Sequence, residues 1–180
     1  RDLDRIVREY ARTISSLLTL EQLATVMMGT INEVLGVQRG MLVVVSKAEY
    51  QVLLRVIEGM GRVENKETAL ALNSPILLHL MRRREPFSPY DLEHHPDLQG
   101  APDAERAWLV ALGAEIFVPI LARDRLLGLL ALGPKRGGEP YGAWDIAFLT
   151  TLCEQTSVAL QNAYLFDEMR GLYNRISRLN

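Results

Sequence analysis

Residues 115–132 read EIFVPILARDRLLGLLAL. The stretch consists of two strongly apolar runs, Glu115 to Leu121 and Leu126 to Leu132, separated by a short polar turn. Apolar runs of strand length on either side of a tight turn indicate an antiparallel hairpin. Pro119 cannot donate a hydrogen bond to a neighbouring strand, so we expect its strand at the edge of a sheet or at a bulge. Gly128 in the second run indicates a place where another backbone segment approaches closely.

A long helix is expected after this hairpin. A loop rich in glycine and proline spans residues 133–142, and the sequence from Ala143 onward contains no helix breaker until Gly171, which a helix tolerates at about 1 kcal/mol. Through Ala163 the residues are apolar or small nearly all round, so this half must pack against the domain. At 1.5 Å per residue, a helix reaching Asn180 would be about 57 Å long, so we expect its end to project.

Both ends of the chain show the same heptad pattern of apolar residues. With 4-3-4-3 spacing, this apolar seam consists of Leu3, Val7, Tyr10, Ile14 and Leu17 near the start and Leu165, Met169, Leu172, Ile176 and Leu179 near the end. Such spacing is typical of helices that pair in a coiled coil. For the N-terminal helix two interpretations remain open, a helix lying on its own domain and a helix pairing with its copy in a homodimer.

The segments in between alternate helical and strand-like patterns. We expect a helix from Thr19 to Gly36, strands at 41–46, 50–58 and 68–72, a helix after Asn73 or Ser74, an irregular stretch at 85–103 and a short helix at 103–112. Thr19 and Gln22 fit a capping box, and Gly36 is placed to end the helix that they begin. Pro75 suits the first position of the next helix.

This ordered set resembles a GAF domain. The motif consists of Val118-Pro119-Ile120, a turn, Leu127-Gly128-Leu129-Leu130-Ala131-Leu132, a loop with Tyr141, Trp144 and Asp145, and a helix that closes with Ala159-Leu160-Gln161-Asn162-Ala163. Leu35-Gly36-Val37 before the first strand is similar too. The resemblance covers roughly residues 19–166.

The resemblance implies an α+β fold, GAF-like or PAS-like, with a central antiparallel sheet of five or six strands and helices on both faces. The first and last helices would pack on one face, and the middle segment would cover a pocket on the other. We therefore divide the chain into a linker or dimerisation helix (1–18), the GAF-like domain (19–166) and a C-terminal coiled-coil extension (167–180).

Composition narrows the class of protein. The 180 residues carry a net charge of −2, which argues against a dedicated nucleic-acid binder. A single cysteine, Cys153, cannot form an internal disulfide. Apolar runs are too short to span a bilayer, so no membrane contact is expected in this segment. We interpret the chain as a cytoplasmic fragment of a longer protein.

No catalytic or metal-binding pattern stands out. Some GAF-like proteins reduce methionine sulfoxide with several cysteines, but here Cys153 lies on the inner half of the last helix and is expected to be an inert core residue. His79 is expected to be partly buried in a helix. His94 and His95, near Asp91, Glu93 and Asp97, are interpreted as a solvated loop, because neighbouring histidines point in different directions.

Missing residues also argue against two classes of ligand. The middle segment has no cysteine for a covalent bilin, and the signature of cyclic-nucleotide-binding GAF domains is missing, so the cofactor remains unknown. A small-molecule pocket, if present, is expected around Phe87, Tyr90, His94, Trp108 and Phe117, residues that also suit ordinary core filling.

The sequence therefore predicts a non-catalytic sensory or regulatory domain of a signalling protein, such as a sensor histidine kinase or a diguanylate cyclase, working as a homodimer. A ligand-free dimerisation module is the alternative hypothesis, and a small redox enzyme is the third.

Overall fold

The computed structural model describes residues 2–17 and 19–179. Its helices are α1 (Leu3–Ile14), α2 (Leu20–Leu35), α3 (Pro75–Arg83), α4 (Pro89–His94), α5 (Asp103–Ala111) and α6 (Ala143–Leu179), with a short 3-10 helix η1 (Pro96–Leu98). Its strands are β1 (Gly40–Lys47), β2 (Gln51–Met60), β3 (Glu67–Ala71), β4 (Ile116–Leu121) and β5 (Leu126–Leu132). Residues 1, 18 and 180, which bound the predicted terminal segments, lie outside the described residues.

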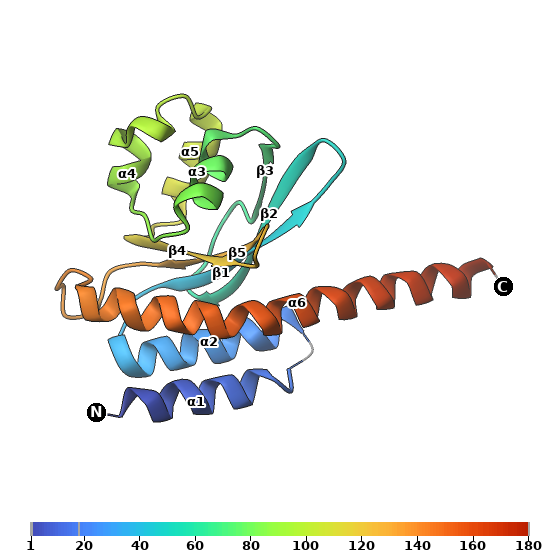
Figure 1. Ribbon diagram of the computed structural model, residues 1–180, viewed down its shortest axis with the longest axis horizontal. Coiled ribbons are helices and arrows are strands. Elements are labelled where there is room, and N and C mark those ends of the chain that lie inside the picture. The colour runs from blue at the N-terminus through green and yellow to red at the C-terminus, as the bar shows by residue number, and fades with distance from the viewer. Residues whose placement is uncertain (1, 18, 180) are drawn as a thin grey trace.

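The strands form one antiparallel sheet in the order β3-β2-β1-β5-β4. Helices α1, α2 and α6 form a layer on one face, and α3, α4, η1 and α5 cover the other (Figure 1). The predicted α+β architecture, with a five-stranded sheet between two helical layers, is confirmed.

The central strand is buried on both faces. Leu42 and Val44 of β1 face the layer of α1, α2 and α6, whereas Met41, Val43 and Val45 face the opposite layer. This alternation follows from the two-residue period of a strand. It explains why β1 has a continuous apolar run rather than alternating polar positions.

The β4–β5 hairpin has the features predicted from its sequence. β4 is an edge strand, and the amide of Phe117 points outward, where it donates to the carbonyl oxygen of Phe87 over 2.8 Å. The nitrogen of Pro119, two residues further on, faces the same side, so its missing hydrogen costs no ladder bond. At Gly128 an added Cβ would lie 2.7 Å from the carbonyl oxygen of Val43, which confirms the predicted close approach.

Helix ends follow the local sequence signals. Thr19 and Gln22 form both hydrogen bonds of the predicted capping box. Gly36 ends α2 in the left-handed region with φ of 63°, which a residue with a side chain adopts only with strain. The Ser74 hydroxyl accepts from the amide of Ile76 and caps α3.

The prediction of an irregular stretch at 85–103 is wrong. This segment contains α4 and η1. Ser88 caps α4 with a second capping box, to Asp91, and Pro89 occupies the first helical position. The several prolines of the segment start short helices rather than break longer ones, because proline is compatible with the first turn of a helix.

A buried ion pair fixes the start of α6. Lys135 and Asp145 are each 8% exposed, and Lys135 Nζ lies 2.5 Å from Asp145 Oδ2. The same oxygen accepts from the amide of Gly142 over 2.8 Å. The carboxylate thus lies in the first turn of α6, where the helix dipole stabilises negative charge.

The 37 residues of α6 make it about 55 Å long at 1.5 Å per residue. Its second half extends beyond the rest of the domain (Figure 1). Among the described residues, no helix combines the length and the hydropathy that crossing a membrane requires.

Candidate functional site

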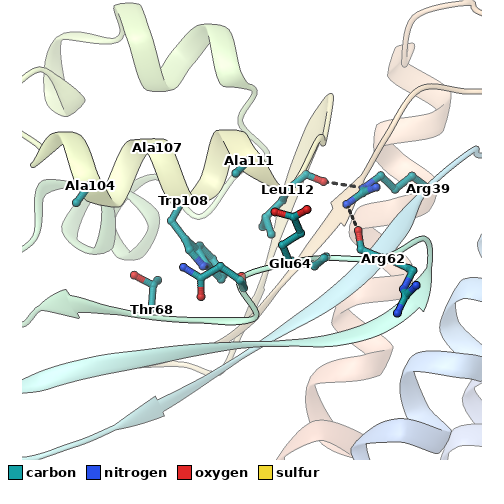
Figure 2. A pocket seen from close by; sticks show the side chains of 11 residues that line it. Arg39, Arg62, Glu64, Thr68, Ala104, Ala107, Trp108, Ala111 and Leu112 are labelled. Carbon is teal, nitrogen blue, oxygen red and sulfur yellow. Dashed lines mark hydrogen bonds between the residues drawn. The ribbon is translucent and has the colours of Figure 1, made fainter.

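A cleft of about 530 Å³ opens between helix α5, the β2–β3 loop and the start of β1 (Figure 2). It is lined by Arg39, Arg62, Val63, Glu64, Asn65, Thr68, Ala104, Ala107, Trp108, Ala111 and Leu112. The volume lies within the range of small-molecule sites. Sequence reasoning placed a pocket under the middle segment but did not include the β2–β3 loop in its wall.

Arg39 links two walls of this cleft at one of its ends. Its Nε donates to the carbonyl oxygen of Leu112 over 2.9 Å, and its Nη2 donates to the carbonyl oxygen of Arg62 over 2.6 Å (Figure 2). The guanidinium therefore connects the end of α5 with the β2–β3 loop. No spacing signal in the sequence predicts this contact, because it links residues far apart along the chain.

Trp108 forms an apolar wall of the cleft. The indole is only 6% exposed, and its Nε1 donates to the carbonyl oxygen of Asn65 over 3.0 Å. Ala104 and Ala107, on the same helix, contribute small side chains that leave space beside the ring. An aromatic wall with the exposed Arg62 and Glu64 at the rim suits a small molecule that has both an apolar part and a polar group.

Of the five residues predicted to line a pocket, only Trp108 lines this cleft. Phe87 and Phe117 are buried in the core under the middle segment, where their rings stack with centroids 4.8 Å apart. Tyr90 is 69% exposed on α4 and lies against His94, with ring centroids 4.4 Å apart. The five residues are therefore not brought together in one cavity.

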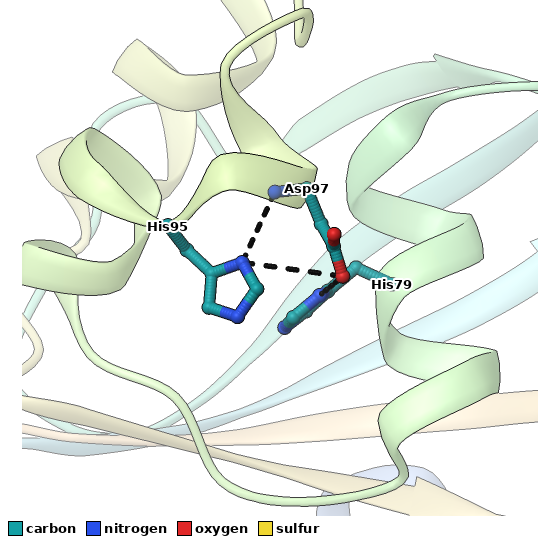
Figure 3. A group of neighbouring side chains, drawn as sticks. All are labelled: His79, His95 and Asp97. Carbon is teal, nitrogen blue, oxygen red and sulfur yellow. Dashed lines mark hydrogen bonds and ion pairs between the residues drawn. The ribbon is translucent and has the colours of Figure 1, made fainter.

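A second group of polar side chains lies in the same layer. His79 of α3, His95 and Asp97 of η1 point toward one another (Figure 3). His79 Nδ1 lies 3.2 Å from Asp97 Oδ2, and His95 Nδ1 accepts from the amide of Asp97 over 3.1 Å. The hydrogen bond with His79 is the main reason why the pKa of the Asp97 carboxyl is lowered.

The neighbouring histidines diverge, as expected. His95 turns toward His79 and Asp97, whereas His94 lies beside Tyr90 and Glu93. Sequence reasoning considered His94 with His95 and treated His79 separately, so it missed the group that the structure assembles. A residue spacing of 16 between His79 and His95 carries no signal for such a contact.

The two apolar seams lie in different environments. On α1, Tyr10 and Ile14 are buried, and Leu3 and Val7 pack partly buried against the same core, as does Leu17 just beyond the end of the helix. On α6, all five seam residues are more than half exposed, from 52% at Ile176 to 86% at Leu179. The α1 seam thus packs against its own domain, whereas that of α6 faces solvent.

Cys153 lies in the core beneath the sheet, at 2% exposure. Burial raises the pKa of its thiol well above the ordinary value, so the nucleophilic thiolate is disfavoured.

Both the sequence and the structure of the chain match known proteins. A family model described as GAF domain matches residues 18–161. The GAF domain from a phosphoenolpyruvate-protein phosphotransferase of Coxiella burnetii has 19% identity and a TM-score of 0.60, and the match covers 91% of this chain and 95% of that one.

Two other solved structures represent different kinds of protein. The GAF domain of a two-component sensor histidine kinase from Bacillus halodurans has 16% identity and a TM-score of 0.54, covering 84% of this chain and 99% of that one. Free methionine-R-sulfoxide reductase from Neisseria meningitidis, in complex with its substrate, has 11% identity and a TM-score of 0.60, covering 91% and 90%. At these identities the likeness establishes the shared fold alone.

Proposed function

Because this chain belongs to the GAF domain family, we propose that it is a sensory or regulatory domain of a larger signal-transduction protein inside the cell. A sensor histidine kinase is one class of protein that carries a domain of this fold, and it is the class of parent protein proposed here. The observation that carries the proposal is the double role of α6. Its first half is part of the core, and its second half projects with an exposed apolar seam.

The partner proposed for this seam is a second copy of the chain. In heptad terms Met169 and Ile176 take the a positions and Leu165, Leu172 and Leu179 the d positions. Ile at a with Leu at d favours a parallel two-stranded coiled coil. The matching seam of α1 is already covered by its own domain, so the dimer contact proposed here rests on α6.

Tyr164 connects the sheet to the base of the projecting segment. Its hydroxyl donates to the carbonyl oxygen of Leu127 over 2.6 Å and accepts from the amide of Val45 over 2.9 Å. Leu127 lies on β5 and Val45 on β1, and these two strands are neighbours in the sheet. A displacement of β1 or β5 would therefore reach α6 one residue before Leu165, where its seam begins.

The proposed input is a small molecule bound in the cleft beside Trp108. To send a signal, it must bind two conformations with different affinity. Arg39 bridges two walls of the cleft and lies directly before β1, so closing the cleft around a ligand would pull on the first residue of that strand.

Sedimentation equilibrium of the full chain tests the dimer. We expect a dimer for the native sequence and a monomer for Leu172→Glu, because a charge at a central d position cannot be buried in the interface. Asn174→Glu, on the opposite side of the same helical turn, is the matched control and should remain dimeric. A native chain that stays monomeric at high concentration would overturn this part of the proposal.

A ligand screen separates a sensor from a ligand-free dimerisation module. The chain has two tryptophans, so Trp144→Phe leaves Trp108 as the single fluorescent reporter. A true ligand should change Trp108 emission and raise the unfolding temperature. Ala107→Met, which fills the cleft, should abolish both effects, and Ala147→Met on α6 should not. A broad metabolite screen without any response would favour the ligand-free module.

A small redox enzyme is the remaining alternative, since a sulfoxide reductase shares the fold. The burial of Cys153, the single cysteine of the sequence, argues against this chemistry in the present chain.

A further inference from the structure

We propose that His79, His95 and Asp97 form a binding site for one divalent transition-metal ion of the Zn²⁺ or Ni²⁺ type, separate from the Trp108 cleft. Each residue offers one ligand atom, and the three atoms all lie within 4.8 Å of one another (Figure 3). Two imidazole nitrogens and one carboxylate oxygen are a ligand set that such ions accept.

The distances are close to those of a coordination sphere. Bonds of about 2.0–2.2 Å to zinc place neighbouring ligands of a tetrahedron about 3.4 Å apart. The observed separations from Asp97 Oδ2 are 3.2 Å to His79 Nδ1 and 4.0 Å to His95 Nδ1. The remaining separation, between the two histidine nitrogens, is at most 4.8 Å, so side-chain rotations that close it by up to about 1.4 Å are needed for a tetrahedron.

The three ligand residues lie on packed elements, so they are positioned before an ion binds. His79 lies on α3 at 5% exposure, and its ring meets that of His95 at a centroid distance of 4.6 Å. His95 caps η1, and the buried Leu98 anchors that helix in the core. Ligands positioned on packed elements lose little freedom when an ion binds.

The protonation states also suit coordination. His95 Nδ1 accepts from the amide of Asp97, so this nitrogen is unprotonated, and its lone pair must turn from that amide to the ion when metal binds. His79 donates from Nδ1 to Asp97, so its proton must move to Nε2 by exchange with water before Nδ1 binds. Two neutral imidazoles and one carboxylate then leave a net charge of +1 on the complex.

The site is open to solvent, and the competing contact between Arg83 and Asp97 is weak. The side chains of His95 and Asp97 are 26% and 30% exposed, so water reaches the site and can complete a tetrahedron. The Nε atom of Arg83 lies 3.8 Å from Asp97 Oδ2, but this side chain is 50% exposed and can turn into solvent when the ion enters. An ion pair this exposed is weak and offers little resistance.

Isothermal titration of the metal-free full chain with ZnCl₂ and with NiCl₂ tests the site. We expect one ion per chain with micromolar or tighter affinity, and Co²⁺ should give the visible absorption of a tetrahedral site. Asp97→Asn retains the shape, and His95→Asn retains a cap for η1. Each should weaken the affinity at least tenfold and abolish the Co²⁺ spectrum, with the circular dichroism of the native fold.

His94→Asn is the matched control, because His94 is adjacent in sequence but directed away from the group. It should bind metal as the native chain does. The proposal is overturned by absence of stoichiometric binding, by binding that Asp97→Asn and His95→Asn leave unchanged, or by an equal loss in His94→Asn.

Discussion

The hydroxyl of Tyr10, on the first helix, lies 2.6 Å from Oγ1 of Thr156, on the last. Thr156 Oγ1 itself donates to the carbonyl oxygen of Leu152 over 2.7 Å, so Tyr10 is the donor of the shared bond. Both side chains are buried, and burial raises the pKa of the Tyr10 hydroxyl. This bond attaches α1 to the helix that we propose as the output of the domain.

The Tyr10–Thr156 bond predicts unequal effects for the two single substitutions. Tyr10→Phe should cost about 1 kcal/mol of unfolding free energy, because Thr156 keeps its bond to Leu152. Thr156→Val should cost more, about 2–3 kcal/mol, because it leaves the buried Tyr10 hydroxyl without a partner. Urea denaturation measures both. Tyr50→Phe, at an 80% exposed tyrosine, is the control and should have no effect. Equal costs would contradict the assigned donor.

The buried Lys135–Asp145 pair predicts a larger effect. Among the described residues, Lys135→Met leaves the Asp145 carboxylate with the Gly142 amide as its remaining hydrogen-bond partner, so we expect a loss of about 3–5 kcal/mol. Adding Asp145→Asn should restore part of the stability, because it removes the uncompensated charge. The exposed Arg5–Glu9 pair is the comparison, and Glu9→Gln should cost at most about 0.5 kcal/mol. Additive losses at 135 and 145 would contradict coupling of the pair.

Much of the fold is predictable because its signals are local. The capping box at Thr19, the positive φ at Gly36 and the edge position of Pro119 each follow from a few neighbouring residues. The same kind of signal at Ser88, three residues before Asp91, marks the start of α4, although the density of prolines in this stretch predicts an irregular segment. Proline content predicts interruption only when the position of each proline within a turn is considered.

The candidate sites depend on contacts that no local pattern encodes. His79 and Asp97 meet because α3 and η1 pack together, and Arg39 meets Leu112 across 73 residues. The seam of α1 shows the same limit, since a heptad pattern indicates an apolar face but not which surface covers it. Only the packed structure shows that Tyr10 and Ile14 face their own core.

Gly128 is predicted to be intolerant of alanine. The new Cβ would lie 2.7 Å from the carbonyl oxygen of Val43 and 3.3 Å from Cδ2 of Leu160, so β1 and β5 would have to separate. We expect a loss of roughly 1–3 kcal/mol in chemical denaturation. Gly171→Ala is the control, because nothing lies within 4 Å of its added Cβ and alanine favours the helix. A stable Gly128→Ala variant would show that the strands can separate at little cost.

Cys153 is predicted to be unreactive in the native protein. Because burial raises the thiol pKa, the thiolate that attacks Ellman's reagent should remain scarce at pH 8 to 9, where an unfolded cysteine begins to ionise. We expect the native reaction to be at least tenfold slower than that in urea, since each pKa unit lowers the thiolate fraction tenfold.

Cys153 also provides the test of the redox alternative. Free methionine-R-sulfoxide with a thiol reductant should not be turned over, and Cys153→Ala should behave as the native chain. Turnover that disappears in Cys153→Ala would establish an enzyme and contradict a purely regulatory function.

Truncation at the two ends is predicted to have opposite consequences. Residues 168–179 of α6 are all exposed, so removing residues 168–180 should change the unfolding free energy of the monomer by less than about 0.5 kcal/mol while abolishing the dimer. Removing residues 1–16 deletes the buried Tyr10 and Ile14, each of which contributes roughly 1.5–3 kcal/mol, so the domain itself should be destabilised.

Urea denaturation at low protein concentration and sedimentation equilibrium measure the two properties separately. If the N-terminal truncation lost the dimer and kept its stability, α1 would be a dimerisation helix rather than part of the core. Retention of both properties by the C-terminal truncation would instead remove the projecting seam from the mechanism, because the contact between two copies would then lie on the domain.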